Sequence, residues 1–188
     1  FGKSEGNALW LNKEKTSSYE LYQYLINTDD SKVLEYLKVF TFLTPAEIMD
    51  VYNEHEKEPH LRKAQKMLAK CIISDLHGEE EYNKAVQISE ALFGGSLEGL
   101  SADDIMLGMK MVPSIQIKGD VRLIDLLVDN QICSSKREAR EMLESGAISL
   151  NNVRHNDENE IINGQLAIDG KVIVIRKGKK KQYMGIIK

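Results

Sequence analysis

The chain has 188 residues, of which 42% are hydrophobic and 29% are charged, and its formal net charge is −4. This composition is too apolar for a wholly disordered chain, and its apolar runs are far shorter than the about 20 residues of a membrane-spanning helix. Cys71 and Cys133 lie far apart and supply neither a disulfide framework nor a zinc knuckle, which favours a reducing, cytoplasmic compartment. The spacing of the histidines predicts no metal site.

The charge is divided unevenly along the chain. Residues 1–114 contain 12 Lys and Arg against 19 Asp and Glu, whereas residues 115–188 contain 13 against 10. Residues 171–188 alone hold seven Lys and Arg and no acid. This asymmetry predicts two small domains, of which the second binds an anionic partner.

The predicted elements of the first part are helices. Residues 1–16 are polar and indicate a loop, after which Ser17 or Ser18 can cap a first helix. The Asn-Thr-Asp-Asp run at 27–30 ends that helix and can cap the next one. The Thr-Pro-Ala-Glu run at 44–47 has the spacing of a capping box, with proline at the first helical position, and begins a third helix.

More helices follow in the same part. Apolar residues recur at helical spacing between 61 and 76, and glutamates begin a further run at 79–93 that a Gly-Gly pair ends. Ser101 opens a short last helix. With about five or six helices and no β-rich run, residues 17–112 are predicted to form an all-α domain.

The pattern changes at residues 113–120, where Ile115, Gln116 and Ile117 alternate between a proline and a glycine. This stretch can be a strand or an extended linker, and we place the domain linker here. Beyond it, residues 121–188 predict a small α+β domain. Its predicted helices are 123–127 and 135–144, and its predicted strands are 147–150, 171–176 and 183–187, with a tight turn at Asn151 and Asn152.

The first candidate site is Gly2-Lys3-Ser4. A lysine beside small, flexible residues suits polyphosphate and is typical of the end of a P-loop, which indicates a nucleotide hydrolase. A P-loop also requires a following apolar helix, whereas residues 5–7 continue as loop. Two interpretations of these three residues therefore remain, a phosphate-binding loop and a plain surface loop.

The second candidate site is the helix that carries Lys136, Arg137 and Arg140. Their spacing lets all three charges reach one side of the helix, near an N-terminus whose unpaired N–H groups also favour phosphate. The alternative is a solvated helix face, on which these cations pair with acids of the same helix, namely Glu138, Glu141 and Glu144.

The third candidate site is a group of five cations within six positions near the C-terminus. Such a group requires solvation or an anionic partner, and Tyr183 beside it can add a stacking surface. RNA is favoured over duplex DNA, because the chain has no recognition helix rich in residues that read base edges. The alternative is a basic tail that adds only solubility. The five cations are Arg176, Lys177, Lys179, Lys180 and Lys181.

Several motifs, taken in chain order, resemble one family. Residues 1–11, Phe-Gly-Lys-Ser-Glu-Gly-Asn-Ala-x-Trp-Leu, are similar to the mobile signature loop of class I aminoacyl-tRNA synthetases, and most of all to that of the bacterial-type tyrosyl-tRNA synthetases. Residues 26–30, 40–43 and 89–93 are similar to segments of that family in and beside its helical anticodon-binding domain. We expect the chain to be the C-terminal part of such an enzyme, beginning inside the signature loop.

The second domain resembles the small RNA-binding domain named after the fourth small-subunit ribosomal protein. The likeness lies in residues 135–151, which run from Ser-Lys-Arg-Glu-Ala-Arg to Gly-Ala-Ile-x-Leu-Asn. Asn152 replaces the glycine that usually follows, and asparagine also tolerates positive φ. Residues 176–183 look like the C-terminal sequence of the same synthetases.

The resemblance implies that the complete enzyme activates tyrosine with ATP and Mg²⁺ and transfers it to its tRNA. It makes Lys3 the catalytic residue that stabilises charge on the leaving pyrophosphate, with Gly2 and Ser4 beside it in the ATP site. It also places Asp29 and Asp30 near the anticodon, where a carboxylate can accept hydrogen bonds from a guanine edge. The alternative for both aspartates is helix capping.

The same resemblance sets expectations for this chain by itself. The nucleotide-binding fold and the tyrosine pocket are not in the sequence, so we expect no tyrosine activation, no bound ATP or Mg²⁺, and binding of tyrosine-accepting tRNA. We expect a monomer, because dimerisation in the family belongs to the catalytic part, and no membrane partner. The alternative function is a stand-alone RNA- or ribosome-associated module, and a P-loop hydrolase is the third hypothesis.

Overall fold

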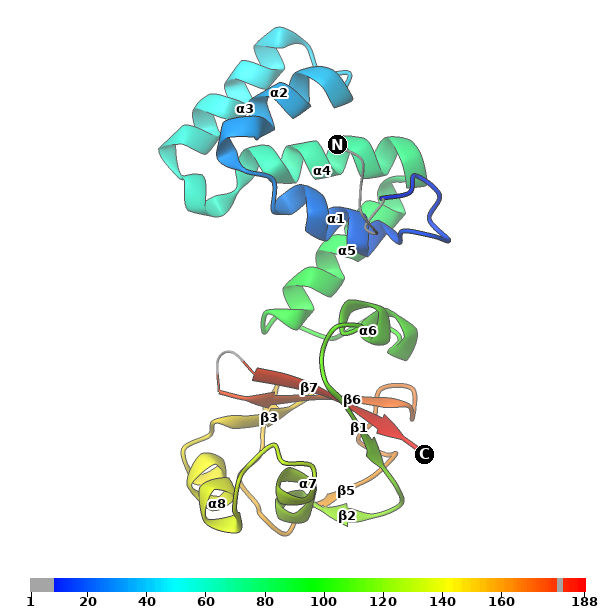
Figure 1. The fold of residues 1–188 in the computed structure, drawn as a ribbon, viewed down its shortest axis with the longest axis vertical. Coiled ribbons are helices and arrows are strands. Elements are labelled where there is room, and N and C mark those ends of the chain that lie inside the picture. Colours follow the sequence, from blue (N-terminus) through cyan, green and yellow to red (C-terminus); the bar gives the residue numbers. More distant parts are fainter. Residues whose placement is uncertain (1–8, 179–180) are drawn as a thin grey trace. The chain divides into compact units, whose positions relative to one another are not determined.

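The computed structural model describes residues 9–178 and 181–188 (Figure 1). The contacts within the chain divide it into two compact units, the first ending at Ser89 and the second beginning at Glu90. The first unit is helical, and the second combines helices with a sheet, so the predicted fold class is confirmed at this level. No helix in the described ranges is long and apolar enough to cross a bilayer.

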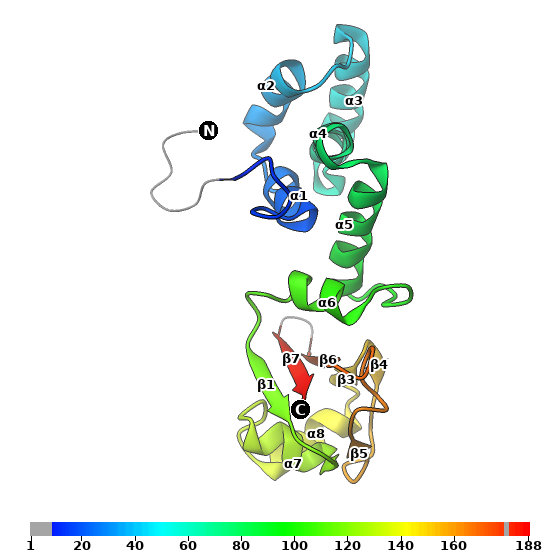
Figure 2. The same cartoon turned by 90° about the vertical axis from the view of Figure 1, so that its right-hand side faces the viewer.

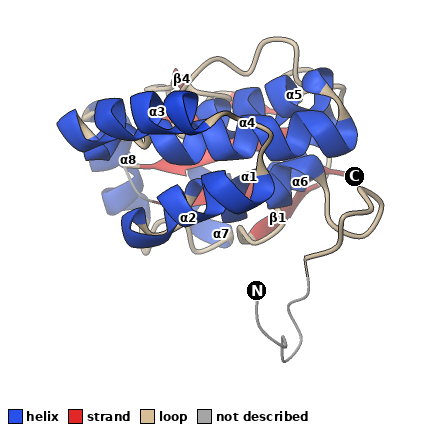
Figure 3. Cartoon of the chain, turned by 90° about the horizontal axis from the view of Figure 1, so that it is seen from above, coloured by secondary structure: helices blue, strands red, loops and turns tan. Residues whose placement is uncertain are grey.

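Helices account for the first unit, as Figures 2 and 3 show. Helix α4 contacts α1, α2 and α3, and its apolar stripe provides the centre of the core, in which Leu68 and Ile73 are fully buried. Complete burial of such a side chain contributes about 2 kcal/mol to folding. The bounds are α1 (Ser18–Ile26), α2 (Asp30–Phe40), α3 (Pro45–Lys57), a 3₁₀ turn η1 (Pro59–Leu61), α4 (Lys63–His77) and α5 (Glu79–Leu92), whose last turn belongs to the second unit.

Three of the predicted helix starts are confirmed by hydrogen bonds. Ser17 caps α1 and Thr44 caps α3, each through a complete capping box with the glutamate three residues further on. Ser101 forms the same box with Asp104 at the start of α6 (Ala102–Gly108). Each box satisfies N–H groups that the first turn of a helix leaves without partners.

The second unit is built on a five-stranded sheet in the order β1-β7-β6-β3-β4. The pair β1 and β7 is parallel, and the other pairs are antiparallel. Two short strands, β2 and β5, form a separate antiparallel pair. The bounds are β1 (Ser114–Ile117), β2 (Val121–Arg122), α7 (Leu123–Asp129), α8 (Lys136–Glu144), β3 (Ile148–Leu150), β4 (Val153–Arg154), β5 (Ile161–Ile162), β6 (Val172–Lys177) and β7 (Lys181–Ile187).

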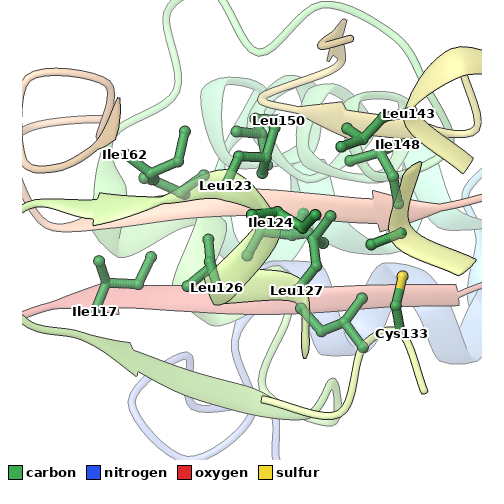
Figure 4. Close-up of a cluster of buried hydrophobic side chains, with 14 residues drawn as sticks. Ile117, Leu123, Ile124, Leu126, Leu127, Cys133, Leu143, Ile148, Leu150 and Ile162 are labelled. Carbon is green, nitrogen blue, oxygen red and sulfur yellow. The ribbon is translucent and has the colours of Figure 1, made fainter. Parts of the chain in front are cut away.

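Helices α7 and α8 cover one face of this sheet. Figure 4 shows the buried side chains of α7 facing Ile148 and Leu150 of β3, with Leu143 of α8 beside them. Helix α6 contacts β6 from the other face (Figure 1). Residues 172–175 of β6 are therefore buried without interruption, as expected for a strand that is covered on both sides.

Residues 113–120, which we predicted to link the domains, supply strand β1 of the sheet. Ser114 to Ile117 pair in parallel with Met184 to Ile187, and Ile117 is buried in the core. The partner strand lies far along the chain, so the short alternation of this stretch does not reveal the pairing. The division between the compact units falls before this strand, between Ser89 and Glu90.

The predicted turn after β3 is confirmed. Asn151 and Asn152 have φ of 48° and 65°, which gives the two positive-φ residues of a tight hairpin turn between β3 and β4. Gly146 ends α8 with φ of 66°. Asparagine and glycine adopt this left-handed conformation at lower cost than other residues, which explains their place here.

Candidate nucleic-acid interface

The predicted contact residues occupy three places in the described structure. Asp29 and Asp30 stand at the start of α2 in the first unit. In the second unit, one set lies on α8 and another on the hairpin of β6 and β7: Lys136, Arg137 and Arg140, and Arg176, Lys177 and Lys181. The remaining predicted residues, Gly2, Lys3, Ser4, Lys179 and Lys180, lie outside the described residues.

The two aspartates at the start of α2 have different surroundings. Asp29 is the N-cap residue, with extended backbone, but its side chain makes no capping hydrogen bond. Oδ1 of Asp30 accepts hydrogen bonds from Nε2 of His55 at 3.1 Å and from Nε2 of Gln65 at 2.6 Å. Neither carboxylate caps the helix through its side chain, although both lie at a helix N-terminus, and both are exposed.

The cations of α8 are exposed and pair only with other surface groups. Lys136 contacts Asp125 of α7 at 2.8 Å, and Arg140 contacts Glu158 at 2.6 Å. Arg137, with 89% of its side chain exposed, pairs with Glu141 at 3.0 Å. Surface ion pairs of this kind contribute about 0 to 1 kcal/mol, so a phosphate can replace the acids at small cost.

One of the three cations pairs with an acid of α8 itself, as the alternative interpretation of this helix predicted. Of the acids on the helix itself, Glu141 pairs with Arg137, whereas Lys136 and Arg140 take partners outside the helix. Hydrogen bonds from Lys136 and Arg122 lower the pKa of Asp125. The ion pairs leave Arg137 as the most exposed charge of this set.

The side chain of Arg176 points into the second unit. Its guanidinium donates to the carbonyl oxygens of Ala91, at 3.4 Å, and Leu92. These carbonyls belong to the last turn of α5, where no intrahelical N–H remains to satisfy them. Asn152 and Gln182 donate to carbonyls of the same turn. Burial lowers the pKa of Arg176, and the residue acts as part of a cap on this helix end.

Lys177 is engaged on the opposite face of the same strand. Its ammonium group donates to Oε1 of Glu138 at 2.6 Å and to the carbonyl of Ile132 at 2.7 Å, and only 13% of its side chain is exposed. Glu138 also accepts from the backbone N–H and the hydroxyl of Ser134, each at 2.6 Å. The bonds from Lys177 and Ser134 lower the pKa of Glu138 to about 2.

The start of α8 has half of a capping box. The Ser135 hydroxyl caps the helix by accepting from the N–H of Glu138. The Glu138 carboxylate does not complete the capping box, because it accepts from Ser134 and Lys177 instead. It thereby ties the start of α8 to strand β6.

The rest of the predicted C-terminal cation group is only partly described. Lys181 is exposed at the start of β7, where it lies opposite Lys177 in the antiparallel ladder. Tyr183, which we expected to offer a stacking surface, is partly buried and packs against the core of the second unit. Among the described members of this group, Lys181 is therefore exposed, whereas Arg176 and Lys177 are partly buried.

Two family models match the chain. Residues 1–94 match the tRNA synthetases of class I (W and Y), and residues 104–185 match the tyrosine-tRNA ligase SYY-like C-terminal domain. The chain belongs to the class I tRNA synthetases. The resemblance to the synthetases is confirmed, and the second match includes α7, α8 and strand β6, which carry most of the cations described above.

Curated relatives agree with this assignment. The chain is 44% identical to tyrosine-tRNA ligase 1 of Bacillus licheniformis over 98% of its own length and 44% of the relative. It is 48% identical to the tyrosine-tRNA ligase of Listeria innocua serovar 6a, with the same shares covered. The chain thus spans less than half the length of these relatives. A solved structure of a C-terminally truncated mitochondrial tyrosyl-tRNA synthetase of Aspergillus nidulans is 40% identical over 46% of this chain and 26% of that chain, with a TM-score of 0.45.

Sequence reasoning missed the internal partners of several polar residues. Arg176 and Lys177 are adjacent in a strand, and successive strand residues point to opposite faces, which was the available signal that they do not share one surface. His55 and Gln65 were not singled out at all, since each lies on a helix and meets Asp30 only in the folded unit.

Proposed function

We propose that this chain is the tRNA-binding part of a tyrosine-tRNA ligase. The observation that carries this proposal is the set of exposed cations on α8, within the part of the chain that matches the C-terminal domain of these ligases. More than half of each cation's side chain is exposed, although Asp125 and Glu158 among the acid partners are half-buried, so the surface can exchange these ion pairs for the phosphates of an RNA backbone.

We propose further that residues 121–188 form an RNA-binding domain of the kind named after the fourth small-subunit ribosomal protein. In support, two helices precede a hairpin whose turn has two positive-φ asparagines, in the order that the resemblance requires. The helical part, residues 17–112, is proposed to bind the anticodon arm through the exposed carboxylates at the start of α2.

In the complete ligase, tyrosine activation is proposed to use ATP and Mg²⁺, with Lys3 as the catalytic residue and Gly2 and Ser4 in the ATP site. Within the described ranges, no group of three or more His, Cys, Asp and Glu side chains is arranged to hold a metal ion. We assign no step of the reaction to the described residues. A monomeric state, a cytoplasmic location and a homodimeric complete enzyme stay predictions.

The test is tRNA binding by this chain at several salt concentrations. Tyrosine-accepting tRNA is expected to bind more tightly than a non-cognate tRNA, with an affinity that falls steeply as salt rises. Removal of Arg137 and Arg140 should flatten the salt dependence, whereas a charge-matched control, Lys118→Ala with Lys171→Ala, should leave it unchanged. Equal binding to all tRNAs would favour a general RNA- or ribosome-associated module, and ATP hydrolysis without tRNA would favour a hydrolase.

A further inference from the structure

A group of cations lies on helix α4 and its N-cap residue, in an otherwise acidic part of the chain. The first unit, residues 1–89, contains 11 Lys and Arg against 15 Asp and Glu. Four of the 11 fall within residues 59–74, which contain no acid. Positive charge is therefore concentrated on the helix at the centre of the unit. The four cations are Arg62, Lys63, Lys66 and Lys70.

Three of these cations follow one exposed side of the helix. Lys66 and Lys70 are four residues apart, which places them on one face of α4, about 6 Å apart along its axis. Arg62, the N-cap residue, stands four residues before Lys66. All three are exposed, whereas Leu68 and Ala69 are fully buried in the core. We call these three cations the α4 stripe.

The two lysines of the α4 stripe have no acid to neutralise them. Lys63, beside the stripe, contacts Glu54 at 3.3 Å and Glu58 at 3.0 Å. Lys66 and Lys70 form no ion pair with any residue of the described ranges. Neighbouring cations of this kind repel one another and attract an anionic partner. The stripe therefore differs from the cations of α8, which must leave an acid before they bind a phosphate.

Hydrogen bonds fix the start of the α4 stripe beside the turn between α1 and α2. Nη1 of Arg62 donates to the carbonyl oxygen of Ile26, the last residue of α1, at 2.8 Å. Nε2 of Gln65 donates to the carbonyl oxygen of Thr28 at 3.1 Å. Helices α1 and α4 lie side by side (Figure 1). The stripe thus begins at the segment that leads into α2 and continues along α4.

We propose that the α4 stripe binds backbone phosphates of the anticodon arm of tRNA. This inference rests on the proposed function, which brings the anticodon arm to the start of α2. The exposed carboxylates of Asp29 and Asp30 repel an RNA backbone there, and a positive surface close to them offsets this repulsion. Contacts to phosphate carry no sequence information, so the stripe contributes affinity and orientation but no choice of base.

The experiment measures how two RNAs bind over a salt series: tyrosine-accepting tRNA, and a stem-loop with the sequence of its anticodon arm. Lys66→Gln combined with Lys70→Gln removes two charges and keeps most of both aliphatic stems. The slope of log affinity against log salt should decrease by about 2 with both RNAs, because each phosphate contact contributes about one. The melting temperature should stay unchanged, since neither lysine forms an ion pair. Arg62 is left unaltered because its bond to Ile26 also holds α1.

Two control variants accompany this one. Lys66→Arg combined with Lys70→Arg keeps both charges and should retain the slope, because a phosphate binds either cation. Lys38→Gln combined with Lys188→Gln removes two other exposed lysines and should also leave the slope unchanged.

The outcomes separate this inference from the function on which it rests. An unchanged slope in folded Lys66→Gln, Lys70→Gln overturns the inference, while tRNA binding that depends on the α8 cations leaves the proposed function intact. A slope that decreases with tRNA but not with the stem-loop also overturns it, because the contact then lies outside the anticodon arm. If the unaltered chain binds neither RNA, the proposed function fails and the inference fails with it.

Discussion

Helix α8 and strand β6 both carry closely spaced Lys and Arg residues in the sequence. In the structure the cations of α8 are exposed to solvent, whereas those of β6 are bound to other parts of the chain. Lys136, Arg137 and Arg140 point outward, with more than half of each side chain exposed. Arg176 instead caps the end of α5. Lys177 forms an ion pair with Glu138, and only 13% of the lysine side chain is exposed. A run of positive charge in the sequence is therefore not the same as a positive surface.

The difference follows from the geometry of the two elements. Residues three and four apart on a helix share a face, so the α8 cations stay together. Neighbours in a strand alternate between faces, so Arg176 turns to one side of the sheet and Lys177 to the other. On each side a specific acceptor is present: the carbonyls of Ala91 and Leu92 on one, and Glu138 on the other. The predictions below test this division of roles.

The largest effect is expected from Lys136→Ala, Arg137→Ala and Arg140→Ala combined. If each cation contacts one phosphate, the affinity for tRNA at physiological salt should fall by about 100-fold, and the slope of log affinity against log salt should decrease by about 2 to 3. The melting temperature should change little, because the ion pairs that are lost are exposed. Binding titrations across a salt series measure the slope. An unchanged slope in a folded variant would exclude α8 from the interface.

The next largest effect is expected from Arg176→Met, which leaves carbonyls of the last turn of α5 without their guanidinium donor. The free energy of unfolding should fall by about 2 kcal/mol, measured by urea denaturation. The salt slope of tRNA binding should stay as in the unaltered chain, because the side chain faces inward. If Arg176→Met is as stable as the unaltered chain but has a smaller salt slope, Arg176 binds RNA and does not stabilise the fold.

A smaller effect on the stability of the fold is expected when the pH is lowered. The pKa of Glu138 is lowered from 4.5 to about 2 in the folded chain, so its bonds to Lys177 and Ser134 stabilise the fold fully above pH 4.5. This stabilisation should be lost progressively as the pH falls from 4.5 towards 2, because Glu138 of the unfolded chain takes up a proton in this range and Glu138 of the folded chain does not. Glu138→Gln cannot titrate, so the difference in stability between it and the unaltered chain should shrink over this window. A difference that is constant with pH would show that the ion pair does not stabilise the fold.

The smallest effect is expected from Lys181→Ala. Lys181 is the exposed cation of the described hairpin, so its loss should reduce the salt slope by about one and leave the melting temperature unchanged. Lys188→Ala provides a matched control, since it also removes one exposed lysine from the same unit. Equal slopes for the two variants would show that Lys181 makes no specific contact with RNA.

Local signals predicted the parts of the fold that local interactions determine. The caps at Ser17 and Thr44 and the turn at Asn151 and Asn152 depend on residues within a few positions, and the structure confirms them. Residues 113–120 were left open between a strand and an extended linker, because the pairing of β1 with β7 joins residues far apart in the sequence. Long-range pairing is not visible in a stretch of four alternating residues.

The candidate site divides in the same way. Exposure of the α8 cations follows from helical spacing, which the sequence displays directly. Other hydrogen bonds join separate elements, and no periodicity in the sequence predicts them. They are those of Arg176 to α5, of Lys177 to α8, and of His55 and Gln65 to Asp30. Charge was therefore predictable, but which charges face solvent depended on tertiary structure.

The most direct test of this account compares two single variants that each remove one positive charge, Arg137→Gln and Lys177→Gln, by tRNA titration over a salt series together with thermal unfolding. The account predicts that Arg137→Gln reduces the salt slope by about one without changing the melting temperature, and that Lys177→Gln lowers the melting temperature without changing the slope. A reduced slope in Lys177→Gln, with none in Arg137→Gln, would contradict the division between a binding helix and a structural strand.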